Sequence, residues 1–191
     1  INQLAIKHSS ATEIGIEGLI ETVEGLSNVD EIARSSEKLE ALVLGMGDYA
    51  ASQRMRINTI GDLYSEACDI WQYPRYRLIV ACHANGINPI DGPYADVKDI
   101  TGLKEDSKKT SMIGMMGKWA IHPDQVTPIT EAFTPGKDVI LTARKQKTAY
   151  EKGLSEGLGS VSVDGVMVDA ANSKTIYELL ALNELYDKTD S

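Results

Sequence analysis

Short apolar runs alternate with longer stretches of mixed polarity along the chain. Each run ends in a polar residue and is followed by a segment with the terminal signals of a helix. This strand–helix order recurs four times and predicts parallel strands joined by helical crossovers. The predicted strands are 14–20, 39–45, 87–90 and 118–121, and the first three predicted helices are 28–36, 60–85 and 104–113.

Proline and glycine mark where several of these elements begin or end. Pro74 is expected to break or kink the long helix 60–85, because proline lacks an N–H group, and Gly86 is expected to end it. Thr134 is the predicted N-cap of the next helix, with Pro135 as its first residue. After that helix come a glycine-rich turn over 153–159, a strand over 160–163 and a final helix over 170–186.

The composition is that of an ordinary globular protein, with 191 residues of which 42% are hydrophobic and 25% are charged. The net charge of −9 argues against general nucleic-acid binding, which needs a basic surface. No apolar run has the length of a membrane-spanning helix, so no membrane partner is expected. Cys68 and Cys82 lie too far apart on one predicted helix for a disulfide. They therefore indicate reduced thiols and a cytoplasmic location.

Four successive predicted strands end in a polar side chain, namely Glu21, Asp48, Asp91 and His122. The carboxyl ends of parallel strands emerge on one side, which carries the active site in a (β/α)8 barrel. Glu21 and Asp48 follow adjacent strands, so we expect them to lie close together. Two carboxylates repel each other unless a cation or a proton lies between them. Mg²⁺ fits this position, because it takes one or two carboxylates and completes its shell with water and substrate.

Each of these polar residues also has a purely structural explanation. A single acid after a strand is commonly a helix cap or a solvated loop residue. His122 can be a capping residue, and Asp91 can be a turn-former. Asp164 belongs to a standard Asp-Gly turn dipeptide. Asp169 stands just before the last predicted helix and is by default its N-cap.

Five motifs taken together resemble one family. They are LIETVEGLSNVDEIA, LEALVLGMGDYAAS, INPIDGPYADVKD, GKWAIHPDQV and DGVMVDAA. These motifs resemble the citrate-lyase-beta-like (HpcH/HpaI-type) aldolases, and within them the malyl-CoA and β-methylmalyl-CoA lyases. The resemblance runs from about Glu17 to the C-terminus. It implies an α/β fold in which 1–131 is the C-terminal part of a TIM (β/α)8 barrel, about four βα units, and 132–191 is a helical lid.

The resemblance also implies a metal-dependent reaction. Glu21 and Asp48 match the family's ligands for Mg²⁺, with Mn²⁺ as an alternative. The implied reaction cleaves or forms a carbon–carbon bond in a 3-hydroxyacyl-CoA such as malyl-CoA, giving glyoxylate and acetyl- or propionyl-CoA. The backbone of Gly47 and Asp48 and the pair Ile121–His122 match positions that line the substrate or coenzyme A.

The lid of the family supplies the proton-transfer group. Asp169 matches the family's acid/base, which reaches into the site of a neighbouring subunit, and Asp164 is the alternative if the register differs. The resemblance therefore implies a homotrimer or a dimer of trimers, with an acyl-CoA thioester and a 2-oxo acid as small-molecule partners.

The sequence departs from the family in length. A complete barrel needs eight strands and typically ~250 residues, whereas four barrel strands are predicted here. We expect the chain to be the C-terminal part of a longer enzyme, without the first four strands, the family's active-site arginine and several CoA-binding residues. Three interpretations stay open. They are a carbon–carbon lyase, including relatives that act on citrate or citramalyl-CoA; a malyl-CoA thioesterase; and an inactive piece that needs a partner chain.

Overall fold

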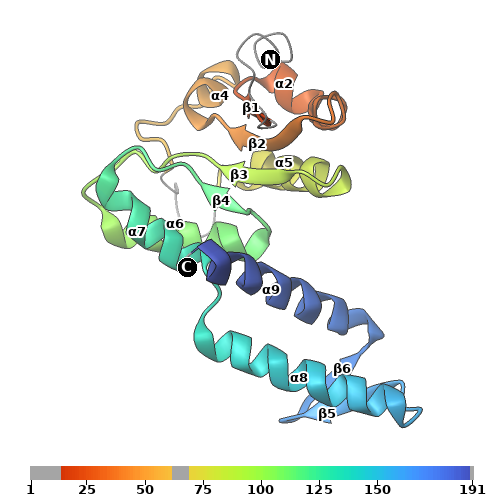
Figure 1. Cartoon of the computed structure of the whole chain (residues 1–191). Helices are drawn as coiled ribbons and strands as arrows, with labels where there is room; N and C mark the ends of the chain where they lie inside the picture. Colours follow the sequence, from red (N-terminus) through yellow and green to blue (C-terminus); the bar gives the residue numbers. More distant parts are fainter. Residues whose placement is uncertain (1–13, 62–68, 190–191) are drawn as a thin grey trace, which may run out of the picture. The chain divides into compact units, whose positions relative to one another are not determined.

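The computed structural model describes residues 14–61 and 69–189. The chain divides into two compact units between Phe133 and Thr134 (Figure 1). This division falls two residues after the boundary predicted at 131. The roles predicted for the two parts, as barrel portion and lid, stay predictions.

Unit 1 contains a four-stranded parallel sheet whose strands lie side by side in chain order (Figure 1). The register pairs Leu19 with Val43, Val43 with Ile90, and Ile90 with Gly117. The parallel order predicted from the alternation of strands and helices is therefore confirmed. The strands are β1 (Ile16–Ile20), β2 (Leu39–Leu44), β3 (Asn88–Asp91) and β4 (Gly117–Lys118).

The fourth strand is shorter than the predicted 118–121. Trp119 still donates its N–H to Asp91 O at 3.1 Å, but Ile121 donates its N–H to the side chain of Gln125 at 2.9 Å. A side chain has thus replaced the neighbouring strand as hydrogen-bond partner. The chain leaves the sheet and enters α7 (Pro123–Phe133), a helix that the sequence did not predict.

The helices of unit 1 differ from the predictions mainly at their starts. The predicted helix 60–85 begins at Gln72, and 62–68, with Cys68, lies outside the described residues. Pro74 does not break it, because it occupies the first turn, where no intrahelical N–H is needed. The helices before α7 are α2 (Val23–Ser27), α3 (Val29–Ala33), α4 (Met46–Ser52), α5 (Gln72–Ala84) and α6 (Ile100–Ile113).

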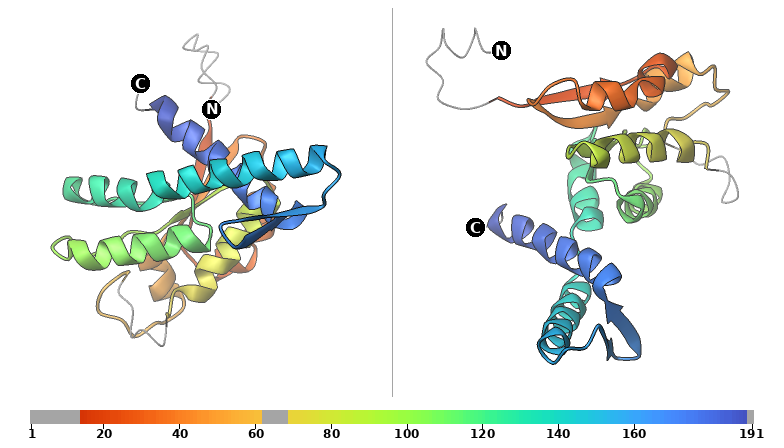
Figure 2. Two further views of the ribbon diagram at one scale, coloured as in Figure 1. Left: turned by 90° about the horizontal axis from the view of Figure 1, so that it is seen from below. Right: turned by 90° about the vertical axis from the view of Figure 1, so that its right-hand side faces the viewer.

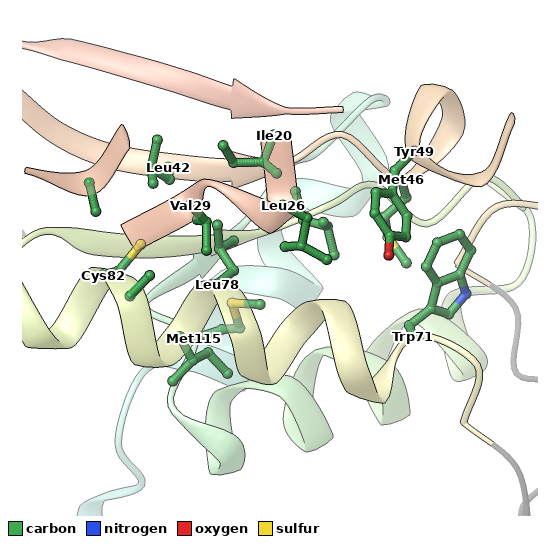
Figure 3. Close-up of a cluster of buried hydrophobic side chains, with 14 of the residues drawn as sticks. Ile20, Leu26, Val29, Leu42, Met46, Tyr49, Trp71, Leu78, Cys82 and Met115 are labelled. Carbon is green, nitrogen blue, oxygen red and sulfur yellow. The ribbon is translucent and has the colours of Figure 1, made fainter. Parts of the chain in front are cut away.

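The main core lies on one face of the sheet. Leu42 and Leu44 point to this face and are fully buried, and α5 packs against β2 and β3. Figure 3 shows Leu42 together with Val29, Leu78 and Cys82 of this core. Cys82 of α5 belongs to this core, and burial raises the pKa of its thiol to about 12. It is a free cysteine, as the sequence predicted.

The opposite face of the sheet is more open. Because side chains alternate along a strand, Leu19, Val43 and Trp119 point away from the main core. Leu19 is 42% exposed and Trp119 is 37% exposed, while Val43 between the strands is buried. The sheet thus carries an apolar surface on both faces.

Unit 2 is a helix, a hairpin and a helix (Figures 1 and 2). The hairpin turns at Asp164 and Gly165, whose φ angles of 51° and 82° match the favoured two-residue turn. The predicted N-cap at Thr134 is wrong, since the first helix begins at Lys137 with Gly136 as its cap. The elements are α8 (Lys137–Ser155), β5 (Ser160–Val163), β6 (Val166–Asp169) and α9 (Ala170–Thr189).

A small core holds unit 2 together. Tyr150 of α8 packs with Val163 and Val168 of the hairpin. Gly153 lies inside α8 rather than in the predicted turn. A glycine is needed there, because a Cβ would come within 2.3 Å of Val161 Cγ1. Across both units, none of the described helices is long and apolar enough to cross a membrane.

Candidate active site

Glu21 directly follows β1, and its side chain lies over the backbone at the end of β2. A Cβ at Gly45 would come within 2.3 Å of Glu21 Cγ and 2.9 Å of its Oε1. Gly45 also donates its N–H to Ile20 O at 2.9 Å, which fixes the two strand ends together. A glycine at position 45 is therefore what lets the Glu21 carboxylate extend across to the neighbouring strand end.

Asp48 lies in the first turn of α4, which begins immediately after β2. The sequence analysis placed Asp48 at the end of the strand 39–45 and predicted no helix there, so α4 is an addition, but the position next to the end of β2 is as expected. Asp48 is exposed and Glu21 is partly exposed. Gly47, beside Asp48, faces Ile60, and a Cβ there would come within 3.1 Å of Ile60 Cδ1.

The two carboxylates suit a hard divalent cation in their chemistry and their number. Glu21 and Asp48 follow neighbouring strands, where two negative charges favour a cation between them. Among the described side chains, there is no group of three or more His, Cys, Asp or Glu residues that could hold a metal ion. Two carboxylates are a number of protein ligands that Mg²⁺ accepts, because it commonly completes its shell with water and substrate.

Asp91 does not join this pair. It ends β3 with a fully buried carboxylate that bonds to Arg75 Nε at 3.0 Å and to the ammonium of Lys118. Asp106 of α6 completes the cluster, 2.8 Å from Lys118 Nζ and 3.0 Å from Arg75 Nη2. The sequence offered Asp91 as a strand-end group of the site or as a turn-former. The structure instead makes it one corner of a buried ion cluster formed by Arg75, Asp91, Asp106 and Lys118.

Opposite charges decide the ionisation of this cluster. Burial alone would raise the pKa of Asp91, but the facing charges and hydrogen bonds of Lys118 and Arg75 hold that pKa below its usual range. Burial would likewise lower the pKa of Arg75, but Asp91 and Asp106 raise it. Asp91 and Arg75 are thus held in their charged forms. The four side chains of the cluster tie α5 and α6 to the ends of β3 and β4 from the helix side of the sheet.

Ile121 and His122 form the loop between β4 and α7, and both are exposed. His122 Nδ1 accepts the N–H of Asp124 at 3.2 Å, so the ring caps the first turn of α7. The capping role considered for this residue is therefore present. An accepting Nδ1 leaves the proton on Nε2 in the neutral ring, and this N–H is a donor on the exposed side.

Gln125 is a residue of this region that the sequence analysis missed. Its side chain is fully buried and bonds to the backbone of two loops, accepting from Ile121 N at 2.9 Å and donating to Tyr94 O at 2.8 Å. A glutamine at the third position of a helix is the partner residue of a capping box, and this signal could have identified it.

Asp169 ends β6 in unit 2 and caps α9. Its Oδ1 accepts the N–H groups of Ala171 at 2.9 Å and Asn172 at 3.0 Å, while Asn172 Oδ1 accepts the N–H of Asp169 at 2.9 Å. The alternative residue, Asp164, sits at the hairpin turn, where Lys145 Nζ donates to both of its oxygens at 2.8 and 2.6 Å. Asp169 therefore keeps its Oδ2 outside the cap, whereas both Asp164 oxygens are paired.

A family model described as HpcH/HpaI aldolase/citrate lyase matches residues 5–123, more than half of the chain. The chain belongs to this family. The matched range contains the whole parallel sheet of unit 1, with both candidate metal ligands and the Ile121–His122 pair. The resemblance read from the five sequence motifs is confirmed.

Curated relatives and solved structures give the scale of the match. The L-malyl-CoA/beta-methylmalyl-CoA lyase of Rhodobacter capsulatus is 36% identical over 169 residues, covering 83% of this chain and 53% of the relative. A citrate lyase structure from Burkholderia xenovorans LB400 superposes with a TM-score of 0.81 at 22% identity, covering 97% of this chain and 57% of that one. The chain thus spans about half the length of these relatives.

A second solved structure contains bound ligands. Protein CitE from Mycobacterium tuberculosis, in complex with magnesium, acetoacetate and coenzyme A, superposes with a TM-score of 0.74 at 22% identity. The match covers 89% of this chain and 61% of the CitE chain. At this level of identity the likeness shows a shared fold. The chain therefore has the α/β fold of a citrate-lyase-type protein over the matched part.

Proposed function

We propose that this chain carries the metal-binding half of a Mg²⁺-dependent carbon–carbon lyase. The substrate is a 3-hydroxyacyl-CoA such as malyl-CoA or β-methylmalyl-CoA, and the products are glyoxylate and acetyl- or propionyl-CoA. The observation that carries the proposal is the placement of Glu21 over Gly45, beside the first turn of α4 that holds Asp48. The lyase activity named for the Rhodobacter capsulatus relative supports the choice of substrate class.

The open face of the sheet belongs to the same proposal. Leu19 and Trp119 on that face are partly exposed, and β1 and β4 are the edge strands of an open sheet. We propose that further strands, from the same polypeptide or from a partner chain, close this sheet into a (β/α)8 barrel. We call this chain together with those strands the complete enzyme. Unit 2 would then be the lid that serves a neighbouring subunit in a trimer or dimer of trimers in the cytoplasm.

Residues of unit 1 would bind and orient the substrate. Glu21 and Asp48 would hold Mg²⁺, or Mn²⁺ in its place, and the bound ion supplies Lewis-acid polarisation of the 2-oxo-acid oxygens. The backbone of Gly47 would approach the same end of the ligand closely. Ile121 would offer an apolar contact to the acyl-CoA half, and His122 would offer its Nε2–H as a hydrogen-bond donor.

Asp169 would move the proton. In the cleavage direction, the acyl-CoA half leaves as an enolate, and protonated Asp169 gives its proton to the enolate carbon. In the reverse direction, the Asp169 carboxylate removes a proton from the acyl-CoA α-carbon. Its Oδ2 is the atom available for this transfer, because Oδ1 is engaged in the cap of α9.

Product analysis of the complete enzyme tests the proposal. With malyl-CoA as substrate, we expect equal amounts of glyoxylate and acetyl-CoA, with thioester absorbance retained, and no activity after treatment with EDTA. A malyl-CoA thioesterase would instead release malate and free coenzyme A. Malate formed without glyoxylate would therefore contradict the lyase assignment.

Asp169→Asn should separate the acid/base role from the capping role. Asparagine caps a helix as well as aspartate, so α9 should keep its start. Loss of a general acid/base should slow hydrogen exchange at the acetyl-CoA methyl group by ~100-fold or more. NMR in D₂O measures this exchange. Asp164→Asn is the matched control, and wild-type exchange in Asp169→Asn would move the role to another group.

A further inference from the structure

A buried side-chain amide joins two loops of unit 1. Gln125 is fully buried, and both ends of its amide are paired, through Ile121 N at 2.9 Å and Tyr94 O at 2.8 Å. Tyr94 follows β3 and Ile121 follows β4, so each partner lies three residues beyond a strand end. Burying an amide is favourable only when its hydrogen bonds are made, so the two loops are fixed relative to each other.

The loop that follows β4, with Ile121 and His122, has a backbone fixed by hydrogen bonds and exposed side chains. Gln125 N donates to His122 O at 3.0 Å, and Asp124 N donates to His122 Nδ1 at 3.2 Å. Together with the bond from Ile121 N, these contacts fix both residues of the pair. Ile121 remains 52% exposed. A fixed backbone that presents exposed side chains is what a binding loop requires.

The loop that follows β3 and carries Tyr94 contacts the segment that packs on Gly47, beside the proposed metal ligand Asp48. Ala95, next to Tyr94, donates its N–H to Ile60 O at 3.0 Å. The Ile60 side chain in turn faces Gly47. A continuous path of contacts therefore runs from Gly47, beside Asp48, through Ile60 and the Tyr94–Ala95 backbone to Gln125. From there it reaches Ile121 and His122.

We propose that Gln125 is a positioning residue that sets the Ile121–His122 loop against the Gly47 end of the acyl-CoA site. The inference rests on the proposed function, because it assigns these residues to one substrate site. Gln125 itself is buried and acts through the two backbones that it bonds. Its removal should therefore weaken binding of the acyl-CoA more than binding of the metal, since it bonds to neither Glu21 nor Asp48.

Gln125→Met tests this role in the complete enzyme. Methionine has a similar length and no hydrogen-bonding amide, so Ile121 N–H and Tyr94 C=O each lose the bond that they make with Gln125. We expect the KM for malyl-CoA to rise about tenfold, a typical effect of two lost buried hydrogen bonds on a loop. The Kd for Mn²⁺, measured by electron paramagnetic resonance as a probe of Glu21 and Asp48, should stay within about twofold. Thr127→Met, on the exposed side of α7, is the matched control.

Gln125→Glu gives a second readout with its own internal control. A protonated glutamic acid has one acceptor and one O–H donor, so it can replace both amide bonds, whereas the carboxylate cannot donate to Tyr94 O. Burial raises the pKa of a carboxyl group, which brings the protonated form into a measurable pH range. We expect the ratio of the variant's KM to the wild-type KM to be high at pH 8 and to fall toward one at pH 6.

The outcomes separate this inference from the proposed function. Wild-type turnover with a Gln125→Met KM within twofold of wild type would overturn the positioning role alone. A parallel loss of Mn²⁺ affinity, or a Gln125→Glu ratio that does not change with pH, would overturn it as well. If Gln125→Met does not fold, the pH series on Gln125→Glu decides. A wild-type enzyme that neither cleaves malyl-CoA nor binds coenzyme A would overturn the proposed function, and the positioning role with it.

Discussion

Glu21→Gln and Asp48→Asn, each made in the complete enzyme, are expected to lower Mg²⁺-dependent turnover of malyl-CoA by ~100-fold or more. Each change removes one of the two carboxylates proposed as ligands within the described part of the chain, and a bound metal contributes several kcal/mol to stabilising a developing charge. The changes are nearly isosteric, so the contact of Glu21 with Gly45 and the first turn of α4 should persist. Steady-state assays across a range of Mg²⁺ concentrations measure the effect.

Matched controls separate the loss of metal binding from the loss of negative charge. The control variants are Glu24→Gln and Asp138→Asn. Glu24 lies three residues beyond Glu21, in the first turn of α2, and Asp138 lies in the first turn of α8, a position like that of Asp48 in α4. Both control residues are exposed. The controls should retain wild-type turnover. Wild-type turnover in Glu21→Gln or Asp48→Asn would rule out the assigned residue as a ligand.

Asp91→Asn is expected to lower the free energy of unfolding by about 3–5 kcal/mol, because it leaves Arg75 and Lys118 buried with too little negative charge. The size of the side chain does not change, so the loss reports charge rather than packing. Urea unfolding followed by tryptophan fluorescence measures it in unit 1, which contains both tryptophans, Trp71 and Trp119.

The matched control for this change is Asp30→Asn. Asp30 of α3 pairs with Arg77 of α5, the helix that also carries Arg75, at 2.8 Å, but the side chains of Asp30 and Arg77 are 42% and 30% exposed. An exposed pair of this kind contributes about 0–1 kcal/mol. If Asp91→Asn lowered the free energy of unfolding no more than Asp30→Asn does, the buried ion cluster would not contribute the stability assigned to it.

The pH dependence of the Asp91 effect follows from its lowered pKa. A carboxyl group whose folded-state pKa lies below its unfolded value stabilises the fold above the unfolded value, about 3.9 for aspartate. That stability is lost as the pH falls toward the folded-state pKa. The asparagine variant cannot lose it, so the difference in unfolding free energy should be full at pH 7 and should shrink below about pH 4.

The order of the parallel strands could be predicted from the sequence because apolar runs and helix signals report local burial directly. The strand Leu39–Leu44 was identified within one residue. The helix after it, Met46–Ser52, was missed because it is short and because Gly45 and Gly47 at its start weaken any helical pattern. The end of β4 was misplaced for a different reason. Ile121 continues the apolar run in sequence, but its N–H is taken by a side chain from the next helix.

The candidate site could be predicted only in part. Glu21 and Asp48 follow adjacent parallel strands, as the sequence predicted, while their role as metal ligands stays a prediction. Asp91 looked equivalent in sequence, yet its buried partners Arg75 and Lys118 come from α5 and β4. Such long-range pairs follow from packing and leave no local pattern. Gln125 was missed although its place in the first turn of α7, four residues after Ile121, is a local signal; only its bond to Tyr94 O is a long-range contact of this kind.

Binding of Mg²⁺ to the complete enzyme, measured by isothermal titration calorimetry, tests the metal centre directly. The double variant Glu21→Gln/Asp48→Asn is compared with the wild type and with the control Glu24→Gln/Asp138→Asn. We predict one bound ion per chain in the wild type and the control, and none in the double variant. A double variant that binds Mg²⁺ as the wild type does, or a wild type that binds none, would contradict a metal centre at Glu21 and Asp48.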